Sequence, residues 1–380
     1  MERVVFVTRT LDAESIHGHK INTSSGLFEL GLLGSLSERV DLRVIHLGAN
    51  CGKLTDIGLF KYKSINYKSV FGPLILAKEI CSNNTTAKLN LLTTGYYPIE
   101  IFVILMASKV IRCKSFSYVY DTHRQATEKM HFVKKILANA YFQIGFYLVK
   151  KTSGLLVIND SFIKKLSIKT PYLKTNIGVI SDSIGDKFCE NEKCFVSSDD
   201  KKIILFAGTI NVENGVDLLI GFVRSNMQLD FELHFYGDGD CVPLIQDLAR
   251  RDSRVKYLGR VSDEVLQRRL RMAGILINLR DPCSITKDYS FPSKLINFMA
   301  TGTPVVSNRF PGLGKEFDDC IYVFDSYDEK SFLKTMVPLL RGALSRSVGV
   351  AARDFVKKNN DWSEISRQVV VFMSSGELVK

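Results

Sequence analysis

The sequence lacks the residue groupings that indicate a metal centre or a membrane span. Its eight cysteines are scattered, and the closest pair, Cys189 and Cys194, has no histidine or second cysteine pair beside it. A zinc site is therefore not expected, and reduced thiols are the default interpretation. No stretch reaches the roughly 20 apolar residues that a spanning helix needs. The best candidate, Ile101–Ala107, is followed by Lys109 and Arg112, and we interpret it as a buried helix.

Other absences argue against further classes of protein. No signal peptide is expected, because the strand-like run RVVFVT begins at Arg3. The glycine-containing loop at 208–215 lacks the Gly-Lys-Ser/Thr ending of a P-loop, which argues against kinase or ATPase chemistry. The sequence shows neither a zinc finger nor an aromatic RNA-binding pattern, so nucleic acid is not an expected partner.

Acidic residues are scarce in the first half of the chain. Residues 1–185 carry 24 Lys and Arg against 13 Asp and Glu, whereas the remainder carries 27 of each. Such asymmetry predicts a negatively charged partner for one domain. Because nucleic-acid motifs are missing, we interpret that partner as an anionic membrane surface. The protein is then expected to be cytoplasmic and peripheral on the inner face of the cytoplasmic membrane.

One segment could provide that membrane contact. Residues 134–151 have lysines at both ends, and aromatic side chains lie within or beside the segment: Phe132, Tyr141, Phe142, Phe146 and Tyr147. The segment is either an ordinary half-buried helix or an interfacial helix. An interfacial helix would be aromatic on one side and basic on the other, and would lie on anionic lipid.

Short apolar runs alternate with helical patterns along the chain. This alternation predicts parallel α/β layers, and 380 residues suit two domains of about 150 to 200 residues each. We expect an N-terminal domain over 1–185, a linker over 186–200, a C-terminal domain over 201–360 and a terminal helix within 361–380. The expected strands are Val4–Thr8, Leu42–Leu47, Leu89–Thr93, Ser117–Asp121, Gly154–Asn159, Ile177–Ile180, Ile203–Ala207, Glu232–Tyr236, Val255–Leu258, Ile275–Leu279, Pro304–Ser307 and Ile321–Phe324.

The most informative stretch is 287–306, KDYSFPSKLINFMATGTPVV. Ser293 is a good N-cap for a short helix over 294–301, which Gly302 ends before the next strand. A helix N-terminus that opens into a pocket binds anions through its free N–H groups and its dipole. Lys294 adds a full positive charge, so a nucleotide diphosphate would suit this arrangement.

This stretch resembles the donor-site signature of retaining glycosyltransferases of the GT-B fold, glycosyltransferase family 4. The bacterial surface-polysaccharide branch is the most similar, with a YSFPSK-type loop before a helix and a GTPVV-type strand. Four further segments match in order, namely LFAGTINVENGVDLL (205–219), FYGDGD (235–240), VKYLGRVSDEVLQRRLRMAGILINLRD (255–281) and PGLGKEF (311–317). The resemblance covers 201–325 well, but over 1–185 only the order of elements agrees. It implies two doubly wound Rossmann-like domains facing a central cleft, with the terminal helix crossing back to the first domain.

The resemblance places the donor-binding residues in the C-terminal domain. They are Gly208, Thr209, Gly237, Gly239, Tyr289, Ser293, Leu295 and Asn297. The glycines would let a ligand approach the backbone closely, although ordinary strand-to-helix turns are the alternative. Lys294 and Arg280 are the expected catalytic residues that balance the diphosphate charge. The alternative for Arg280 is a solvated surface residue.

The sequence departs from the family pattern within this site. The Arg and Lys that often flank the glycine loop correspond to Thr209 and Asn214, and the usual two glutamates correspond to Tyr289 and Asn297. The later glutamate normally takes the ribose hydroxyls of the nucleotide, whereas Asn297 keeps only one carbonyl acceptor. Nucleotide binding should therefore be weaker or differently arranged.

Two N-terminal segments follow expected strands. The first provides a cleft loop of His17, Gly18, His19 and Lys20, similar to the loop that GT-B enzymes place near the donor phosphate and the acceptor. The second provides Asp121 and His123 as further catalytic candidates, because a histidine near this place contacts the transferred sugar in similar enzymes. The alternatives are surface histidines in the first segment and an aspartate that caps a helix in the second.

The resemblance thus implies transfer of a sugar, with retention, from a nucleotide-diphosphate sugar to a lipid-linked glycan. The acceptor would be polyprenyl-diphosphate-linked or otherwise lipid-linked, in bacterial lipopolysaccharide or O-antigen synthesis. No cofactor and no metal are expected, because the paired aspartates of metal-dependent transferases are missing. The alternative is a non-catalytic binding partner of another transferase, which Thr209, Asn214 and Asn297 motivate.

Overall fold

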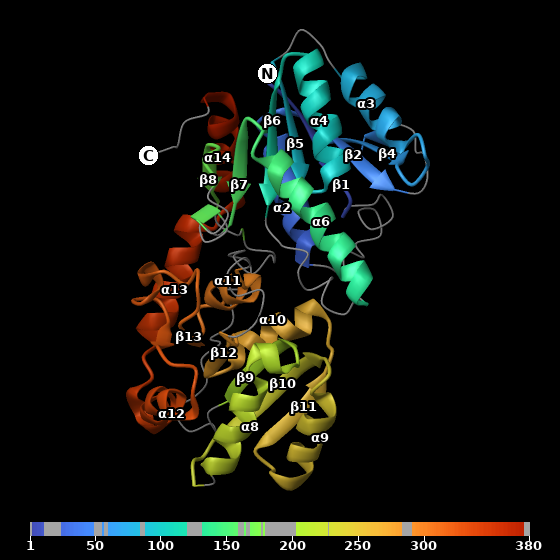
Figure 1. The fold of residues 1–380 in the computed structure, drawn as a ribbon. Helices are drawn as coiled ribbons and strands as arrows, with labels where there is room; N and C mark the ends of the chain where they lie inside the picture. Colours follow the sequence, from blue (N-terminus) through green and yellow to red (C-terminus); the bar gives the residue numbers. More distant parts are fainter. Residues whose placement is uncertain are drawn as a thin grey trace. The chain divides into compact units, whose positions relative to one another are not determined.

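The computed structural model of the chain (Figure 1) contains two compact units, which are described separately. The N-terminal unit comprises Met1–Ile180, Asp288–Ser290 and Asp361–Lys380, and the C-terminal unit comprises Ser181–Lys287 and Phe291–Asn360. The structure describes residues 2–10, 24–48, 55–56, 60–83, 88–119, 131–158, 163–164, 168–175, 178, 203–226, 228–282 and 291–375.

The N-terminal unit is built on an eight-stranded sheet in the order β3-β4-β2-β1-β5-β6-β7-β8. Its strands are β1 (Arg3–Thr8), β2 (Asp41–Gly48), β3 (Thr55–Asp56), β4 (Lys61–Asn66), β5 (Leu89–Thr94), β6 (Lys114–Val119), β7 (Gly154–Val157) and β8 (Tyr172–Lys174). All neighbouring strands are parallel except β3 and β4. Every residue of β1 and β5 is buried, as expected of central strands in a parallel sheet with covered faces.

Five helices of the N-terminal unit fall within the described residues. They are α2 (Ser24–Ser37), α3 (Gly72–Ser82), α4 (Pro98–Val110), α6 (Phe132–Val149) and α14 (Trp362–Ser375). Helix α4 packs against α3 and α6, and α14 packs against α2. Aromatic contacts hold α14 in place, because Trp362 lies edge-on to Phe28 at 5.3 Å and Phe372 lies edge-on to Phe116 at 5.8 Å between ring centroids. The last helix of the chain therefore belongs to the N-terminal unit.

The C-terminal unit contains a parallel six-stranded sheet in the order β11-β10-β9-β12-β13-β14. Its strands are β9 (Ile203–Thr209), β10 (Glu232–Asp238), β11 (Val255–Gly259), β12 (Ile275–Asn278), β13 (Val305–Asn308) and β14 (Tyr322–Phe324). Its helices are η3 (Val212–Asn214), α8 (Val216–Ser225), α9 (Val242–Arg251), α10 (Asp263–Met272), α11 (Ser293–Ala300), η4 (Lys315–Phe317), α12 (Glu329–Pro338), η5 (Leu339–Ala343) and α13 (Arg346–Asn359).

The two doubly wound sheets confirm the α/β class predicted from the sequence, and most expected strands form. Strands β3, β4 and β8 were not expected, because their sequences are short or alternate with polar residues, as in KYKSIN. The strand expected at Ile177–Ile180 lies outside the described residues except for Gly178, which is not in a strand. Among the helices that the structure describes, none combines the length and the apolar character needed to cross a membrane.

Candidate functional site

The C-terminal sheet reverses its strand order between β9 and β12. From β9 the chain moves outward to β10 and β11, and then returns to the other side of β9 with β12. In doubly wound sheets, ligands bind beyond the carboxyl ends of the strands at this point. Gly208 and Thr209 end β9 and Arg280 follows β12, so the topology brings three of the predicted site residues to one edge.

Lys294, in the first turn of α11, lies against the glycine loop at this edge. A β-carbon added to Gly208 would lie 3.5 Å from Cδ and 3.8 Å from Nζ of Lys294. The ammonium also lies 4.7 Å from the centre of the Phe206 ring and 5.9 Å from that of Phe298, within the range of cation–π contacts. Lys294 and Gly208, two of the predicted site residues, therefore lie close together in the structure.

Burial, assisted by the positive charge of Arg280, lowers the pKa of Lys294 to about 7. Among the residues that the structure describes, no carboxylate contributes to this shift. A desolvated cation beside a second positive charge is unfavourable unless an anion lies near it. The two side chains therefore form a site suited to a negatively charged group.

The N-terminus of α11 is also suited to bind an anion. The sequence predicted Ser293 as N-cap, but the helix begins at Ser293 and Pro292 occupies the N-cap position. Since proline has no side-chain acceptor, no side chain caps the helix. The N–H groups of Ser293 and Lys294, which precede the bonded N–H of Leu295, thus retain the capacity to bind an anion.

The backbone of Arg280 is fixed by Asn308 at the end of β13. The Arg280 N–H donates to Oδ1 of Asn308 at 2.8 Å, and Nδ2 of Asn308 donates to the Arg280 carbonyl at 2.9 Å. Asn308 is fully buried. The sequence analysis did not identify this residue, because its partner lies 28 positions away; a polar residue ending the apolar run PVVSN was the available signal.

The glycine loop is held by its own amides. Nδ2 of Asn214 donates to the Thr209 carbonyl at 2.8 Å, and the Asn214 N–H donates to Oδ1 of Asn211 at 3.1 Å. Thr209 is exposed. Positions 209 and 214 therefore contribute no positive charge to this loop, whereas Lys294 and Arg280 bring positive charge to the same edge.

Gly237 and Gly239 lie against that loop rather than in open space. A β-carbon on Gly237 would overlap the carbonyl oxygen of Gly208, and one on Gly239 would overlap that of Ile210. Both have positive φ, +131° and +155°. The structure therefore gives these glycines a packing role in shaping the loop, and direct donor contact stays a prediction.

The remaining predicted residues of α11 differ in position. The Leu295 side chain is fully buried, and its N–H donates to the Pro292 carbonyl at 2.9 Å. Asn297 is half-buried, one turn after Ser293 and on the side of the helix that carries Lys294. Leu295 thus supports the site through packing, whereas Asn297 is placed where a ligand bound by Lys294 could extend.

Several predicted residues lie outside the described residues. They are His17, Gly18, His19, Lys20, Asp121, His123 and Tyr289.

The N-terminal sheet has its own reversal of strand order, between β1 and β5. Arg9 directly follows β1, and Glu100 lies in the first turn of α4, after β5. Nε of Arg9 donates to Oε1 of Glu100 at 2.6 Å, and Nη2 of Arg9 donates to the same oxygen. The guanidinium lies 4.3 Å from the Tyr97 ring centre and 5.5 Å from that of Tyr67. We name these four residues the Arg9–Glu100 cluster.

The Arg9–Glu100 cluster contains buried polar atoms without hydrogen bonds. Glu100 is 1% exposed, and within the described part of the chain neither its Oε2 nor the Tyr67 hydroxyl has a hydrogen-bond partner. Burial, assisted by the negative charge of Glu100, raises the pKa of Tyr67. Unpaired buried polar atoms are uncommon and mark sites where a ligand or water completes the bonding. The sequence analysis missed this cluster, although a glutamate in an otherwise apolar helix was the available signal.

The chain is similar to known proteins in sequence over part of its length and in fold over nearly all of it. Residues 201–342 match the family model described as glycosyl transferases group 1. Among curated proteins, no sequence matches the chain. Among solved structures, HepE of Anabaena in complex with UDP has a TM-score of 0.67 at 13% identity, with 99% of this chain and 100% of that chain covered.

Two further structures have the same fold. A glycosyltransferase from Rickettsia africae has a TM-score of 0.67 at 15% identity, covering 98% of each chain. The lipopolysaccharide outer core galactosyltransferase WaaB has a TM-score of 0.65 at 13% identity, covering 97% of this chain and 99% of that chain. Residues 201–342 therefore resemble the glycosyl transferases group 1 family in sequence, and the chain has the GT-B fold of these solved structures.

Proposed function

We propose that the protein transfers a sugar, with retention, from a nucleotide-diphosphate sugar to a lipid-linked glycan. The observation that carries this proposal is Lys294. Its ammonium is desolvated, lies beside the Gly208 backbone and the charge of Arg280, and is paired with no carboxylate of the described residues. The diphosphate of a donor would supply the missing negative charge.

The chemistry proposed for Lys294 and Arg280 is stabilisation of the departing diphosphate. Negative charge grows on the leaving group as the bond to the sugar breaks, and preorganised positive groups in a water-poor site lower the energy of that state. The uncapped N–H groups of α11 act in the same direction. No cofactor or metal is included in the proposal. HepE has been solved with UDP, so uridine diphosphate sugars are the first donors to test.

The acceptor proposed is a polyprenyl-diphosphate-linked or otherwise lipid-linked glycan of bacterial surface polysaccharide synthesis, at the inner face of the cytoplasmic membrane. The basic N-terminal half of the chain supports this location. WaaB, which shares the fold, acts on the lipopolysaccharide outer core according to its name. A lipopolysaccharide or O-antigen glycan is therefore the acceptor class of choice.

The Arg9–Glu100 cluster is our candidate for binding acceptor hydroxyls. The Arg9 guanidinium, held by the buried Glu100, has a side chain that is 40% exposed and can donate to a sugar hydroxyl, and the flanking tyrosine rings suit sugar faces. Glu100→Gln should raise KM for the acceptor about tenfold or more, because a hydrogen bond to a charged group is worth roughly 1.5–3 kcal/mol. Donor binding should not change. An unchanged acceptor KM in a folded variant would remove the cluster from the proposal.

The test of the donor assignment is sugar release and transfer by the purified chain with Lys294→Ala. Turnover should fall at least a hundredfold, in line with the roughly 10²–10³-fold loss on removing one oxyanion donor. Lys358→Ala, an exposed lysine in α13, is the matched control and should keep full turnover. Unchanged turnover in Lys294→Ala would contradict the proposal.

The second candidate is a non-catalytic binding partner of another transferase. This candidate is favoured by the absence of charge at Thr209 and Asn214. The Asn214 side chain already donates a hydrogen bond to the Thr209 carbonyl. Donor binding without turnover on any lipid-linked acceptor, together with stimulation of a second transferase, would support this candidate over the first.

A further inference from the structure

Large apolar side chains are exposed on one helical layer of the N-terminal unit. The layer consists of α3, α4 and α6, in which α4 packs against both other helices (Figure 1). We define the α3–α4–α6 face by its exposed large hydrophobic side chains: Val70, Phe71, Leu74, Ile99, Phe102, Met106, Val110, Phe132, Val133, Ile136, Leu137, Ile144 and Tyr147. They are between 46% and 92% exposed.

The spacing of these residues shows that they form stripes. In α4 the exposed positions Ile99, Phe102, Met106 and Val110 recur every three or four residues, which places them on one side of the helix. The opposite side, including Ile101 and Ile104, is buried in the core. A helix that is apolar all round is expected to be covered on both sides, so the outer side of α4 needs a partner.

Helix α6 has the same character and is more exposed. Phe132 is 72% exposed and Leu137 is 65% exposed, and of the 18 residues only Gly145 and Val149 are fully buried. Contiguous exposed apolar surface of this kind marks a protein or membrane interaction site.

The exposed charges that the structure describes around the α3–α4–α6 face are positive. The exposed charged side chains are Lys68, Lys78, Lys109, Arg112, Lys134, Lys150 and Lys151. The acidic residues of the described stretches 60–83, 88–119 and 131–158 are Glu79 and Glu100. Glu79 is ion-paired with Lys63 at 2.5 Å, and Glu100 is buried against Arg9. No exposed carboxylate therefore opposes an anionic partner within these stretches.

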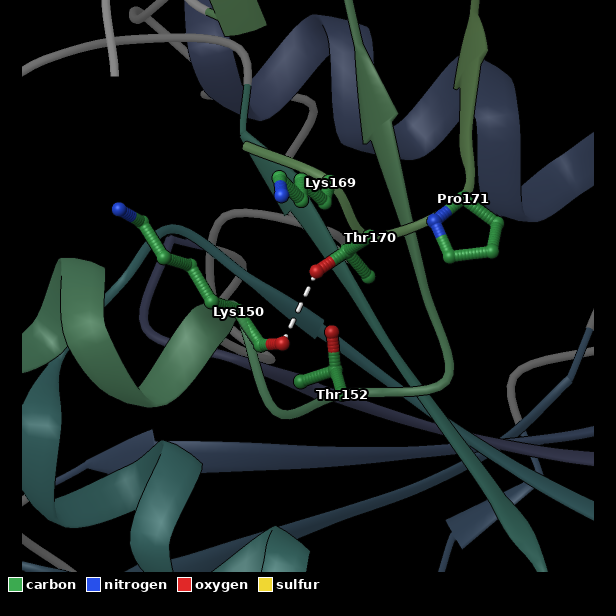
Figure 2. Close-up of a pocket in the computed structure, with 5 residues that line it drawn as sticks. All are labelled: Lys150, Thr152, Lys169, Thr170 and Pro171. Carbon is green, nitrogen blue, oxygen red and sulfur yellow. Dashed lines mark hydrogen bonds between the residues drawn. The ribbon is translucent and has the colours of Figure 1, made fainter. Parts of the chain in front are cut away.

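The basic character continues past the end of α6. A hollow of 440 Å³ is lined by Lys150, Thr152, Lys169, Thr170 and Pro171 (Figure 2). The Thr170 hydroxyl donates to the Lys150 carbonyl at 2.9 Å, which joins the end of α6 to the loop that carries Lys169. Two lysines thus lie at the rim where the apolar stripe of α6 ends.

We propose that the α3–α4–α6 face docks onto an anionic lipid bilayer, with its apolar stripes in the headgroup region and its lysines on the lipid phosphates. The positive charge of the face favours an anionic bilayer as its partner, because a bilayer of acidic lipids presents negative charge over the whole extent of the face. The inference deepens the proposed membrane location and rests on it for the choice of lipid. It does not depend on the chemistry of the donor site.

The test is co-sedimentation of the full chain with vesicles of phosphatidylglycerol and phosphatidylcholine, compared with phosphatidylcholine alone, at low and high salt. We expect binding to the anionic vesicles that weakens as salt rises. Leu137→Glu and Phe102→Glu should each lower the partition coefficient at least tenfold. Leu244→Glu, which makes the same change at a 58% exposed site in the C-terminal unit, should leave it unchanged.

Several outcomes would overturn the proposal. Wild-type chain that stays in the supernatant with anionic vesicles would do so, as would Leu137→Glu binding as well as wild type. Conversion of a dimer into a monomer by Leu137→Glu, with vesicle binding unaffected, would show that a second copy covers the face. Nucleotide-sugar binding measured on the same samples should be equal in all variants, so that failure of docking is distinguishable from failure of the proposed transferase activity.

Discussion

At the scale of single residues, Lys294 combines features that the sequence could suggest only in part. A lysine at the start of a short helix was readable as an anion contact. Its desolvation was not, because burial depends on Phe206 and Phe298, which pack beside it in the fold. The Arg9–Glu100 cluster likewise depends on the fold, since its two charged partners are 91 positions apart in the sequence.

The lowered pKa of Lys294 predicts a pH dependence of donor binding. Below about pH 7 the Lys294 ammonium is protonated in the free protein. Above this pH the amine is neutral, so binding of a diphosphate requires the uptake of one proton from solvent. The affinity for a nucleotide-diphosphate sugar should therefore fall between pH 7 and 8.5, by up to about tenfold per pH unit. Isothermal titration calorimetry across this range measures the fall.

Lys294→Arg is the informative comparison, because an arginine stays protonated at these pH values. Its affinity should show little change between pH 7 and 8.5. If the wild-type affinity is also independent of pH, Lys294 does not contact the diphosphate.

At the scale of elements, the C-terminal unit was the more predictable. Its strands are short runs of apolar residues bounded by glycine or charged residues, and each expected strand there forms. In the N-terminal unit, β4 was missed because KYKSIN reads as polar, although Tyr62 and Ile65 are buried. Strand β8 is three residues long at the edge of the sheet, too short for a periodic pattern to show.

The packing of the glycine loops predicts the effect of Gly237→Ala. The new methyl group would overlap the Gly208 carbonyl oxygen, and φ at this position is +131°. Backbone strain of about 1–3 kcal/mol adds to the steric overlap, so the midpoint of urea unfolding should fall clearly and donor binding should weaken. Gly34→Ala, in helix α2 with open space around it, is the control. It should be neutral or stabilising, because alanine favours helix by about 1 kcal/mol over glycine. Equal stability of both variants would contradict the packing role of Gly237.

At the scale of the whole molecule, two parallel sheets were predictable from the alternation of strands and helices. The uneven distribution of charge was also predictable, because the whole net positive charge comes from residues 1–185. An exposed apolar face was one of two alternatives for residues 134–151. The segment Ile101–Ala107 was expected to be buried, but Phe102 and Met106 within it are exposed, which depends on how α4 packs on the sheet.

The central claim is that the chain binds a nucleotide-diphosphate sugar through Lys294. The most direct measurement is calorimetric titration of the full chain with a panel of nucleotide-diphosphate sugars, repeated with Lys294→Ala. We predict that one nucleotide family binds and that the variant loses at least about tenfold in affinity, as expected for a charge-assisted hydrogen bond. Absence of binding by every member of the panel, or equal binding by the variant, would contradict the claim.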